Sequence, residues 1–165
     1  MNVGRFLRPL TIAGGLLLLG SGFSHADAPM NERQVESFAR AYTAAWNSLD
    51  PAQVASFYAE DGSLTINQGT PSIGRLAIGA AAEEFMVAFP DLVLEFDGLE
   101  FEDGRVNYHW TFIGTNTGPG GTGNAVNFSG YESWDFDADG LIDNSLGHFD
   151  ENEYQRQLEN GADAE

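Results

Sequence analysis

The chain has 165 residues, and its 25 acidic residues outnumber seven arginines, which gives a formal net charge of −18; it has no lysine and no cysteine. So large a negative charge disfavours nucleic acid and anionic membrane surfaces as partners. The lack of cysteine excludes thiol nucleophiles, thiolate metal sites and disulfides. The excess of acidic residues is best explained as a solvated surface that keeps the protein in solution, in preference to a site for a specific cationic partner.

The first 26 residues have the pattern of a secretory signal peptide. Arg5 and Arg8 form a positive region, residues 10–20 are apolar, and Ser24–Ala26 supplies the small residues that a signal peptidase reads. The apolar run is too short to span a membrane. We therefore expect an exported protein, periplasmic or secreted, with no membrane contact after cleavage. A single domain over 27–160 and a frayed tail over 161–165 follow.

Helical periodicity dominates the first half of the mature chain. Apolar residues recur at helical spacing from Asn31 to Ser48, which predicts an amphipathic helix there. Asp50 and Pro51 have the pattern of an N-cap followed by proline at the first helical position. Further along, the sequence predicts a second helix over 51–58, a strand over 63–67 and a third helix over 80–89.

Beyond residue 90 the pattern changes to an alternation with period two, which is typical of half-buried strands. Gly114–Gly123, with five glycines and a proline, suits a loop between two of them. The expected strands cover 92–101, 106–112, 127–136 and 141–149, with a last helix over 151–158. Helices followed by a run of antiparallel strands indicate an α+β fold.

The order of these elements and several short segments resemble the SnoaL-like polyketide cyclase branch of the nuclear-transport-factor-2-like (NTF2-like) superfamily. The carrying segments are Ala88–Leu92, Asp103–Val106, Trp110–Gly118, Thr122–Gly123, Asp139–Ile142, Phe149–Asp150 and Gln157–Leu158. The resemblance implies an NTF2-like cone, a curved antiparallel sheet wrapped around the N-terminal helices with a central hydrophobic cavity. It also implies a homodimer and chemistry that uses no metal or cofactor.

In the cyclases of this family an aspartate near the chain end is the general acid/base for an intramolecular aldol condensation, and the family pattern places it at Asp150. A carboxylate in an apolar cavity has a raised pKa and can exchange protons near neutral pH. His148 would orient Asp150. Asn116 replaces a histidine that is frequent in the family, so it can orient a carbonyl but not carry a proton. The alternative for Asp150 is a helix N-cap and nothing more.

Other side chains are candidates for contact with a ligand. Glu132 alternates in phase with Phe128 and Trp134 and would face the cavity, unless the strand slips at Gly130. His109 is out of phase with its neighbours and is either a structural residue or a ligand contact. With the inward stripe of the first helix, the predicted ligand-binding residues are Tyr42, Trp46, Asn47, His109, Trp110, Glu132 and Trp134.

Two other kinds of site fit this sequence less well. A ketosteroid isomerase would need a carboxylate where Ile66 and Asn67 stand. The acidic segment 135–143 imitates an EF-hand loop but has Leu146 at the position of the bidentate glutamate, so an acidic hairpin turn is the better interpretation. We therefore expect no metal.

Three functions remain open from the sequence. The first is an acid/base enzyme of the cyclase or isomerase type that acts on a small apolar carbonyl compound, with Asp150, Asn116 and His148 as its catalytic residues. The second is a non-catalytic protein that binds a small apolar molecule in the same cavity. The third is a dimeric interaction module whose cavity is filled by its own aromatic side chains.

Overall fold

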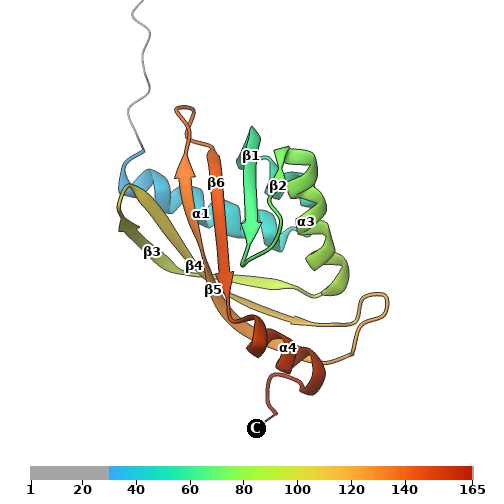
Figure 1. Ribbon diagram of the computed structural model, residues 1–165. Helices are drawn as coiled ribbons and strands as arrows, with labels where there is room; N and C mark the ends of the chain where they lie inside the picture. The colour runs from blue at the N-terminus through green and yellow to red at the C-terminus, as the bar shows by residue number, and fades with distance from the viewer. Residues whose placement is uncertain (1–29, 165) are drawn as a thin grey trace, which may run out of the picture.

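The computed structural model describes residues 30–164, which form a curved six-stranded sheet with helices beside it (Figure 1). The predicted signal peptide lies outside these residues. The helices are α1 (Glu32–Asn47), α2 (Pro51–Ala55), α3 (Gly74–Ala88) and α4 (Glu151–Asn160). The strands are β1 (Tyr58–Ile66), β2 (Ser72–Ile73), β3 (Val93–Glu102), β4 (Arg105–Thr115), β5 (Ala125–Phe136) and β6 (Ile142–Phe149).

The strands follow the order β2-β1-β6-β5-β4-β3 across the sheet. Every neighbouring pair is antiparallel except β1 and β6, which run in the same direction. The predicted α+β fold is confirmed, with this one parallel pair as a difference. It arises because β6 returns from its hairpin with β5 to lie beside the first strand of the chain, a pairing that local sequence does not show.

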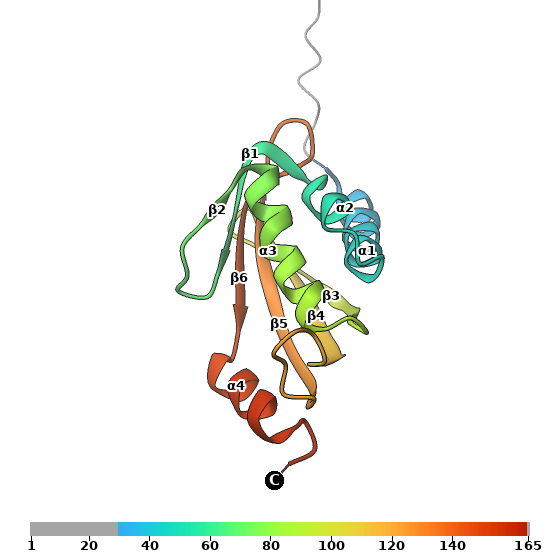
Figure 2. The same cartoon turned by 90° about the vertical axis from the view of Figure 1, so that its right-hand side faces the viewer.

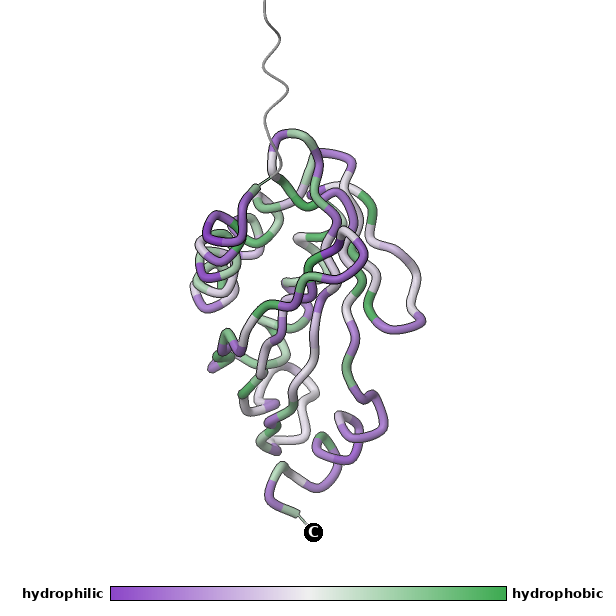
Figure 3. Tube along the Cα trace, turned by 90° about the vertical axis from the view of Figure 1, so that its left-hand side faces the viewer, coloured by the Kyte–Doolittle hydropathy of each residue, from purple (hydrophilic) through white to green (hydrophobic). Residues whose placement is uncertain are grey.

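Helices α1 and α3 lie beside the sheet, where α1 packs against β3 and α3 packs against β1 (Figures 1 and 2). Helix α4 lies at the far end, against β5. Within residues 30–164, no helix combines the length and the apolar character that a membrane crossing needs. Figure 3 shows polar and apolar positions alternating along the strands and a mostly hydrophilic α4.

Helix α1 starts where the sequence predicts, since Asn31 and Gln34 form a reciprocal capping box. Helix α2 is shorter than expected and ends at Ala55. The cause is long-range: Phe57 accepts a hydrogen bond from Ile142, and Tyr58 already pairs with the same residue as part of the sheet.

Helix α3 begins at Gly74, six residues before the expected start. The expectation treated its early glycines as part of a loop, but Gly79 lies inside the helix at the contact with α2. A Cβ at Gly79 would lie 3.7 Å from the Cβ of Ala55. A side chain at this position would make only ordinary contact with α2, and the glycine does not interrupt the helix.

The inward side of the sheet carries the hydrophobic core. Residues of β4 alternate strictly between buried and half-buried, and Val106, Tyr108, Trp110 and Phe112 face inward. The pairing of β4 with β5 runs without a register shift from Val106–Trp134 to Thr115–Ala125. The strand therefore does not slip at Gly130, and Glu132 faces the interior.

Hydrogen bonds hold residues 162 and 164 of the expected C-terminal tail. The backbone N–H of Ala162 donates to the carbonyl of Ala125, 2.8 Å away, and Arg156 reaches the carbonyl of Ala164. These bonds attach the residues after α4 to the start of β5.

Candidate functional site

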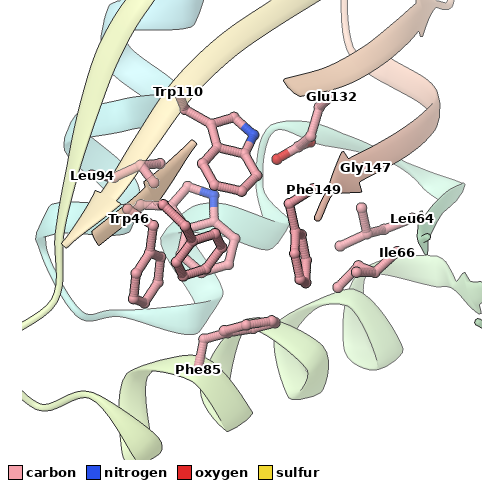
Figure 4. A pocket seen from close by; sticks show the side chains of 11 residues that line it. Trp46, Leu64, Ile66, Phe85, Leu94, Trp110, Glu132, Gly147 and Phe149 are labelled. Atoms are coloured by element: carbon pink, nitrogen blue, oxygen red, sulfur yellow. The ribbon is translucent and has the colours of Figure 1, made fainter. Parts of the chain in front are cut away.

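An apolar cavity of about 50 Å³ lies between α1, α3 and the inner side of the sheet (Figure 4). Three of its lining residues, Ile66, Phe85 and Phe149, are only partly buried and mark the side nearest to solvent. The full lining is Trp46, Leu64, Ile66, Phe85, Leu94, Trp110, Phe112, Phe128, Glu132, Gly147 and Phe149. Within residues 30–164, Glu132 is the only acidic or basic side chain that lines it.

The carboxyl group of Glu132 is held unequally at its two oxygens. Oε2 accepts hydrogen bonds from Ser145 Oγ at 2.7 Å and Trp134 Nε1 at 3.0 Å, and the hydroxyls of Tyr42 and Tyr58 lie at 3.2 and 3.3 Å. Oε1 has one such neighbour, the Tyr42 hydroxyl at 3.3 Å. Oε2 therefore fixes the group in place, and Oε1 keeps acceptor capacity for a ligand.

Burial raises the pKa of Glu132 above its usual range, and the hydrogen bonds from Trp134, Ser145, Tyr42 and Tyr58 oppose that rise. Burial also raises the pKa of Tyr42 and of Tyr58, and the neighbouring Glu132 adds to both shifts. The two phenols therefore stay protonated and act as donors. The result is a carboxyl group that is suited to proton exchange closer to neutrality than an exposed glutamate.

Gly130 lets Trp110 stand beside this carboxyl group. A Cβ at Gly130 would lie 2.6 Å from Cζ2 of Trp110 and 2.5 Å from the carbonyl oxygen of His148. Only a residue without a side chain fits beneath the indole ring. The glycine thus places the aromatic wall of the cavity and keeps the strand in register.

The three tryptophans of the site differ in their hydrogen bonds. Trp134 is fully buried and donates to Glu132. Trp46 and Trp110 are each 8% exposed, and neither indole N–H has a hydrogen-bond partner in the described part of the chain. The Trp46 N–H lies near the Tyr42 hydroxyl and acts to lower its pKa, but the two groups lack hydrogen-bond geometry.

Comparison with known proteins decides the family. The profile of the SnoaL-like polyketide cyclases matches residues 36–158, most of the chain. The chain belongs to this family. None of the curated proteins compared with it matches significantly.

Solved structures share the fold. A candidate SnoaL-like polyketide cyclase from Jannaschia sp. CCS1 is 16% identical over 81% of this chain and 96% of its own, with a TM-score of 0.69. A candidate polyketide cyclase from Xanthomonas campestris pv. campestris is 24% identical over 78% of this chain and 99% of its own, with a TM-score of 0.65. A hypothetical protein of ketosteroid-isomerase-like fold from Catenulispora acidiphila, in complex with trimethylamine, is 14% identical over 73% of this chain and 91% of its own, with a TM-score of 0.65.

In this SnoaL-like protein, Asp150 does not stand in the cavity, contrary to expectation. Its side chain is exposed, and Oδ1 accepts hydrogen bonds from the backbone N–H groups of Asn152 and Glu153, as an N-cap of α4 does. The reason is the alternation at the end of β6: Phe149 takes the inward position and lines the cavity, so the next residue turns away.

The two residues predicted to assist Asp150 also lie elsewhere. Asn116 is buried, but its amide donates to the carbonyl of Ala88 and accepts from the backbone of Thr122, so it fixes the glycine-rich loop. His148 lies on the outer side of the sheet, with its ring 4.8 Å from that of Tyr131. Neither lines the cavity.

Two predicted ligand-binding residues lie away from both the cavity and the carboxyl group of Glu132. Asn47 exchanges hydrogen bonds with the backbone of Leu94 and ties α1 to the edge of β3. His109 lies on the outer side, next to Tyr131, with Nε2 3.2 Å from a carboxylate oxygen of Glu100. The other five lie together: Trp46, Trp110 and Glu132 line the cavity. Tyr42 and Trp134 do not line it but form hydrogen bonds with Glu132.

Sequence reasoning missed several members of the Glu132 environment. Tyr58 falls in the segment assigned to the second helix, and Ser145 has no distinguishing neighbour in the sequence. The register shows why they matter: Ser145 pairs with Trp134, and Tyr58 opens the strand that runs beside β6. Period two along β6 places Ser145, Gly147 and Phe149 on one side of the sheet. This alternation is the sequence pattern that could have identified Ser145 as a neighbour of the cavity.

No three histidine, aspartate or glutamate side chains between residues 30 and 164 gather in an arrangement that could hold a metal ion. In the acidic turn, Asp137 instead accepts the backbone N–H groups of Asp139 and Leu141. The EF-hand-like segment thus forms a hairpin turn closed by its own side chain.

Proposed function

We propose that this SnoaL-like protein is an exported, cofactor-independent acid/base enzyme for a small apolar carbonyl compound, and that Glu132 transfers the proton. One observation carries the proposal: among residues 30–164 a single carboxyl group lines an otherwise apolar aromatic cavity, and its Oε1, which accepts from Tyr42, keeps capacity for a further hydrogen bond. Apolar surroundings bring a carboxyl pKa closer to working pH, which is what general acid/base catalysis needs.

The neighbours of Glu132 suit the same role. Ser145 and Trp134 hold Oε2 and so fix the orientation of the carboxyl plane, which leaves Oε1 directed to a substrate. Tyr42 and Tyr58 lie 3.0 Å apart at their hydroxyls and stabilise the ionised form when it occurs. A group held in this way moves little during proton transfer.

The test compares two conservative substitutions. Glu132→Gln keeps the shape of the side chain and one acceptor oxygen but cannot take up a proton, so we expect turnover to fall by roughly 10²- to 10⁴-fold. Asp150→Asn keeps the helix cap and should leave turnover within about twofold of the natural protein. Exchange of α-hydrogens for deuterium in a panel of small ketones, followed by NMR, measures both. Loss of exchange in Asp150→Asn, with Glu132→Gln active, would reinstate Asp150.

A second function, reversible binding without catalysis, is favoured by a different observation. Glu132 already accepts bonds from four side chains, as a purely structural buried carboxyl does, and its cavity is aromatic. Such a cavity with an anion suits a small organic cation. The Catenulispora neighbour holds trimethylamine. Binding of trimethylammonium that is lost in Glu132→Gln, without α-hydrogen exchange by the natural protein, would favour this function.

We also propose that the protein is exported and dimeric. The signal-like pattern of residues 1–26 supports export. Half-buried rings of His109, Tyr131 and His148 form a row across β4, β5 and β6 on the outer side of the sheet, and they support association through that side. Mass spectrometry of the secreted chain tests the first point. Sedimentation of the natural protein and of Tyr131→Glu tests the second, with a monomer expected only for the variant.

A further inference from the structure

Two hydrogen-bond donors in the cavity are left without acceptors. Buried polar groups in proteins nearly always have a partner, so each exception requires an explanation. The indole N–H groups of Trp46 and Trp110 are exceptions within residues 30–164, and both residues line the cavity that contains Glu132. Two unpartnered donors at one small cavity indicate that something else accepts their hydrogen bonds.

The position of Trp110 is the more informative of the two. Figure 4 shows its indole nitrogen on the side of the ring that faces the carboxyl group of Glu132, with no hydrogen bond between them. Gly130 permits this placement, because any larger residue would collide with the ring. Donor and carboxyl group therefore face each other without a hydrogen bond, so an acceptor that bonds this indole would lie beside the carboxyl group.

We propose that the N–H groups of Trp110 and Trp46 hold the carbonyl oxygen of a compact, enolisable ketone or aldehyde beside Glu132. This rests on the proposed function and names its substrate class. An acceptor oxygen satisfies the two donors, while the carbon next to the carbonyl lies at the free Oε1 of Glu132.

The corresponding reaction is enolisation, and its atoms balance without a co-reactant. Oε1 of Glu132 takes a proton from the α-carbon, so a C–H bond breaks and an O–H bond forms. The C–H electron pair becomes the C=C bond of an enolate, and the negative charge on oxygen is stabilised by the two indole donors. Return of the proton to the same or another carbon completes exchange or isomerisation.

Cavity size limits the substrate. About 50 Å³ accommodates a group equal to roughly four water molecules, far less than a fused multi-ring polyketide needs. A Cβ at Gly147 would lie 3.8 Å from Cγ of Glu132, at ordinary contact distance, so Gly147→Ala reduces this space without a clash. We therefore expect a substrate of one small ring or a short chain.

The experiment uses the three indole N–H signals of the full mature protein in ¹⁵N NMR. Cyclopentanone is the probe, and methylenecyclopentane, which has the same shape but no acceptor oxygen, is its matched control. We expect cyclopentanone to move the Trp46 and Trp110 signals downfield. The Trp134 signal, already bonded to Glu132, should move least and serves as an internal reference.

The outcomes separate this inference from the proposed function. Indole shifts with cyclopentanone alone support the carbonyl site, and if Glu132→Gln and the natural protein then exchange α-hydrogens equally, only the catalytic proposal fails. Exchange without indole shifts, equal shifts with both probes, or shifts with neither would overturn the carbonyl site. Persistent cross-peaks from the indoles to water in the presence of saturating probe would also overturn it, since water would then be the acceptor.

Variants provide a second readout. Trp110→Phe removes the donor and keeps an aromatic ring, so we expect exchange to fall by roughly 10²-fold or more with the Trp134 signal unchanged. An unchanged Trp134 signal shows that the variant is folded around Glu132. Exchange within twofold of the natural rate in a folded Trp110→Phe would contradict the role of its N–H.

Discussion

At the scale of single residues, the site depends on Glu132, a buried acid whose pKa is set by its surroundings. Glu132 is 7% exposed and surrounded by aromatic rings, yet every hydrogen bond it accepts comes from a neutral donor. In the described part of the chain, no arginine pairs with it. Ionisation of Glu132 therefore costs stability, and the cost is set by burial.

This cost gives a pH prediction for Glu132→Gln. Because the folded-state pKa of Glu132 is raised above its ordinary value of 4.5, the native state binds more protons than the unfolded state above that pH. The stability of the natural protein relative to the variant is therefore full below pH 4.5 and falls as the pH rises through the raised pKa. Urea unfolding of both proteins at several pH values measures this. A difference that grows in favour of the natural protein with rising pH would contradict it.

Gly130 gives a second prediction at this scale. Gly130→Ala forces a Cβ against the Trp110 ring and a backbone oxygen, so we expect a loss of about 1–3 kcal/mol in the free energy of unfolding. Gly147→Ala on the next strand is the matched control, with less than about 1 kcal/mol expected because its Cβ has room. Chemical unfolding followed by tryptophan fluorescence compares them. Equal effects would show that the close approach at Gly130 is unimportant.

At the scale of elements, the polar residues that the family resemblance assigned to the active site cap helices and fix loops in this chain. Asp150 begins α4, and Asn116 fixes the loop between β4 and β5. The loop is drawn onto α3 because Gly118 donates to the carbonyl of Ala88, where any Cβ on Gly118 would collide with Val87. These residues position elements around the cavity without lining it.

For Asn116→Ala we expect a loss of about 1–3 kcal/mol, because the buried amide of Asn116 bonds both the carbonyl of Ala88 and the backbone N–H of Thr122, and both bonds are lost. The loop should also become more sensitive to limited proteolysis. Thr117→Ala, on the exposed side of the same loop, is the control and should change stability by less than about 0.5 kcal/mol. A variant of Asn116 that keeps its stability but loses α-hydrogen exchange would instead place the amide in the chemistry.

At the scale of the whole molecule, charge sets the conditions for stability. Cleavage after Ala26 would leave five arginines against 25 acidic residues, a net charge of −20. Self-repulsion of this size destabilises a compact state and is screened by salt. The described part of the chain shows three arginine–carboxylate pairs, each of them at least partly exposed, so they offset little of it.

We therefore expect the mature protein to gain stability when sodium chloride is raised from about 10 to about 150 mM at neutral pH. Thermal unfolding at both concentrations measures the gain. Near the isoelectric point, where the net charge vanishes, the same change in salt should have little effect. A salt effect of equal size at both pH values would show that repulsion is not its cause.

Local chemistry was sufficient for much of the fold. Capping residues and period determined α1, α4 and the long strands, because these features act between residues a few positions apart. Period two in β5 also favoured an inward Glu132, and the unbroken pairing of β4 with β5 through Gly130 decided it. The length of α2 and the start of α3 did not follow, because Tyr58 pairs with Ile142 and Gly79 packs against Ala55, contacts that bring distant segments together.

The sequence by itself determined an α+β chain of the SnoaL-like kind with an acidic surface and an aromatic interior. Only the tertiary structure decided which acid shares that interior. Phase along a single strand turns Asp150 outward after Phe149, while the meeting of α1, β1, β5 and β6 surrounds Glu132 with Tyr42, Tyr58, Trp134 and Ser145. Burial and hydrogen bonding between distant segments tune a carboxyl group, and neither can be read from its neighbours in the chain.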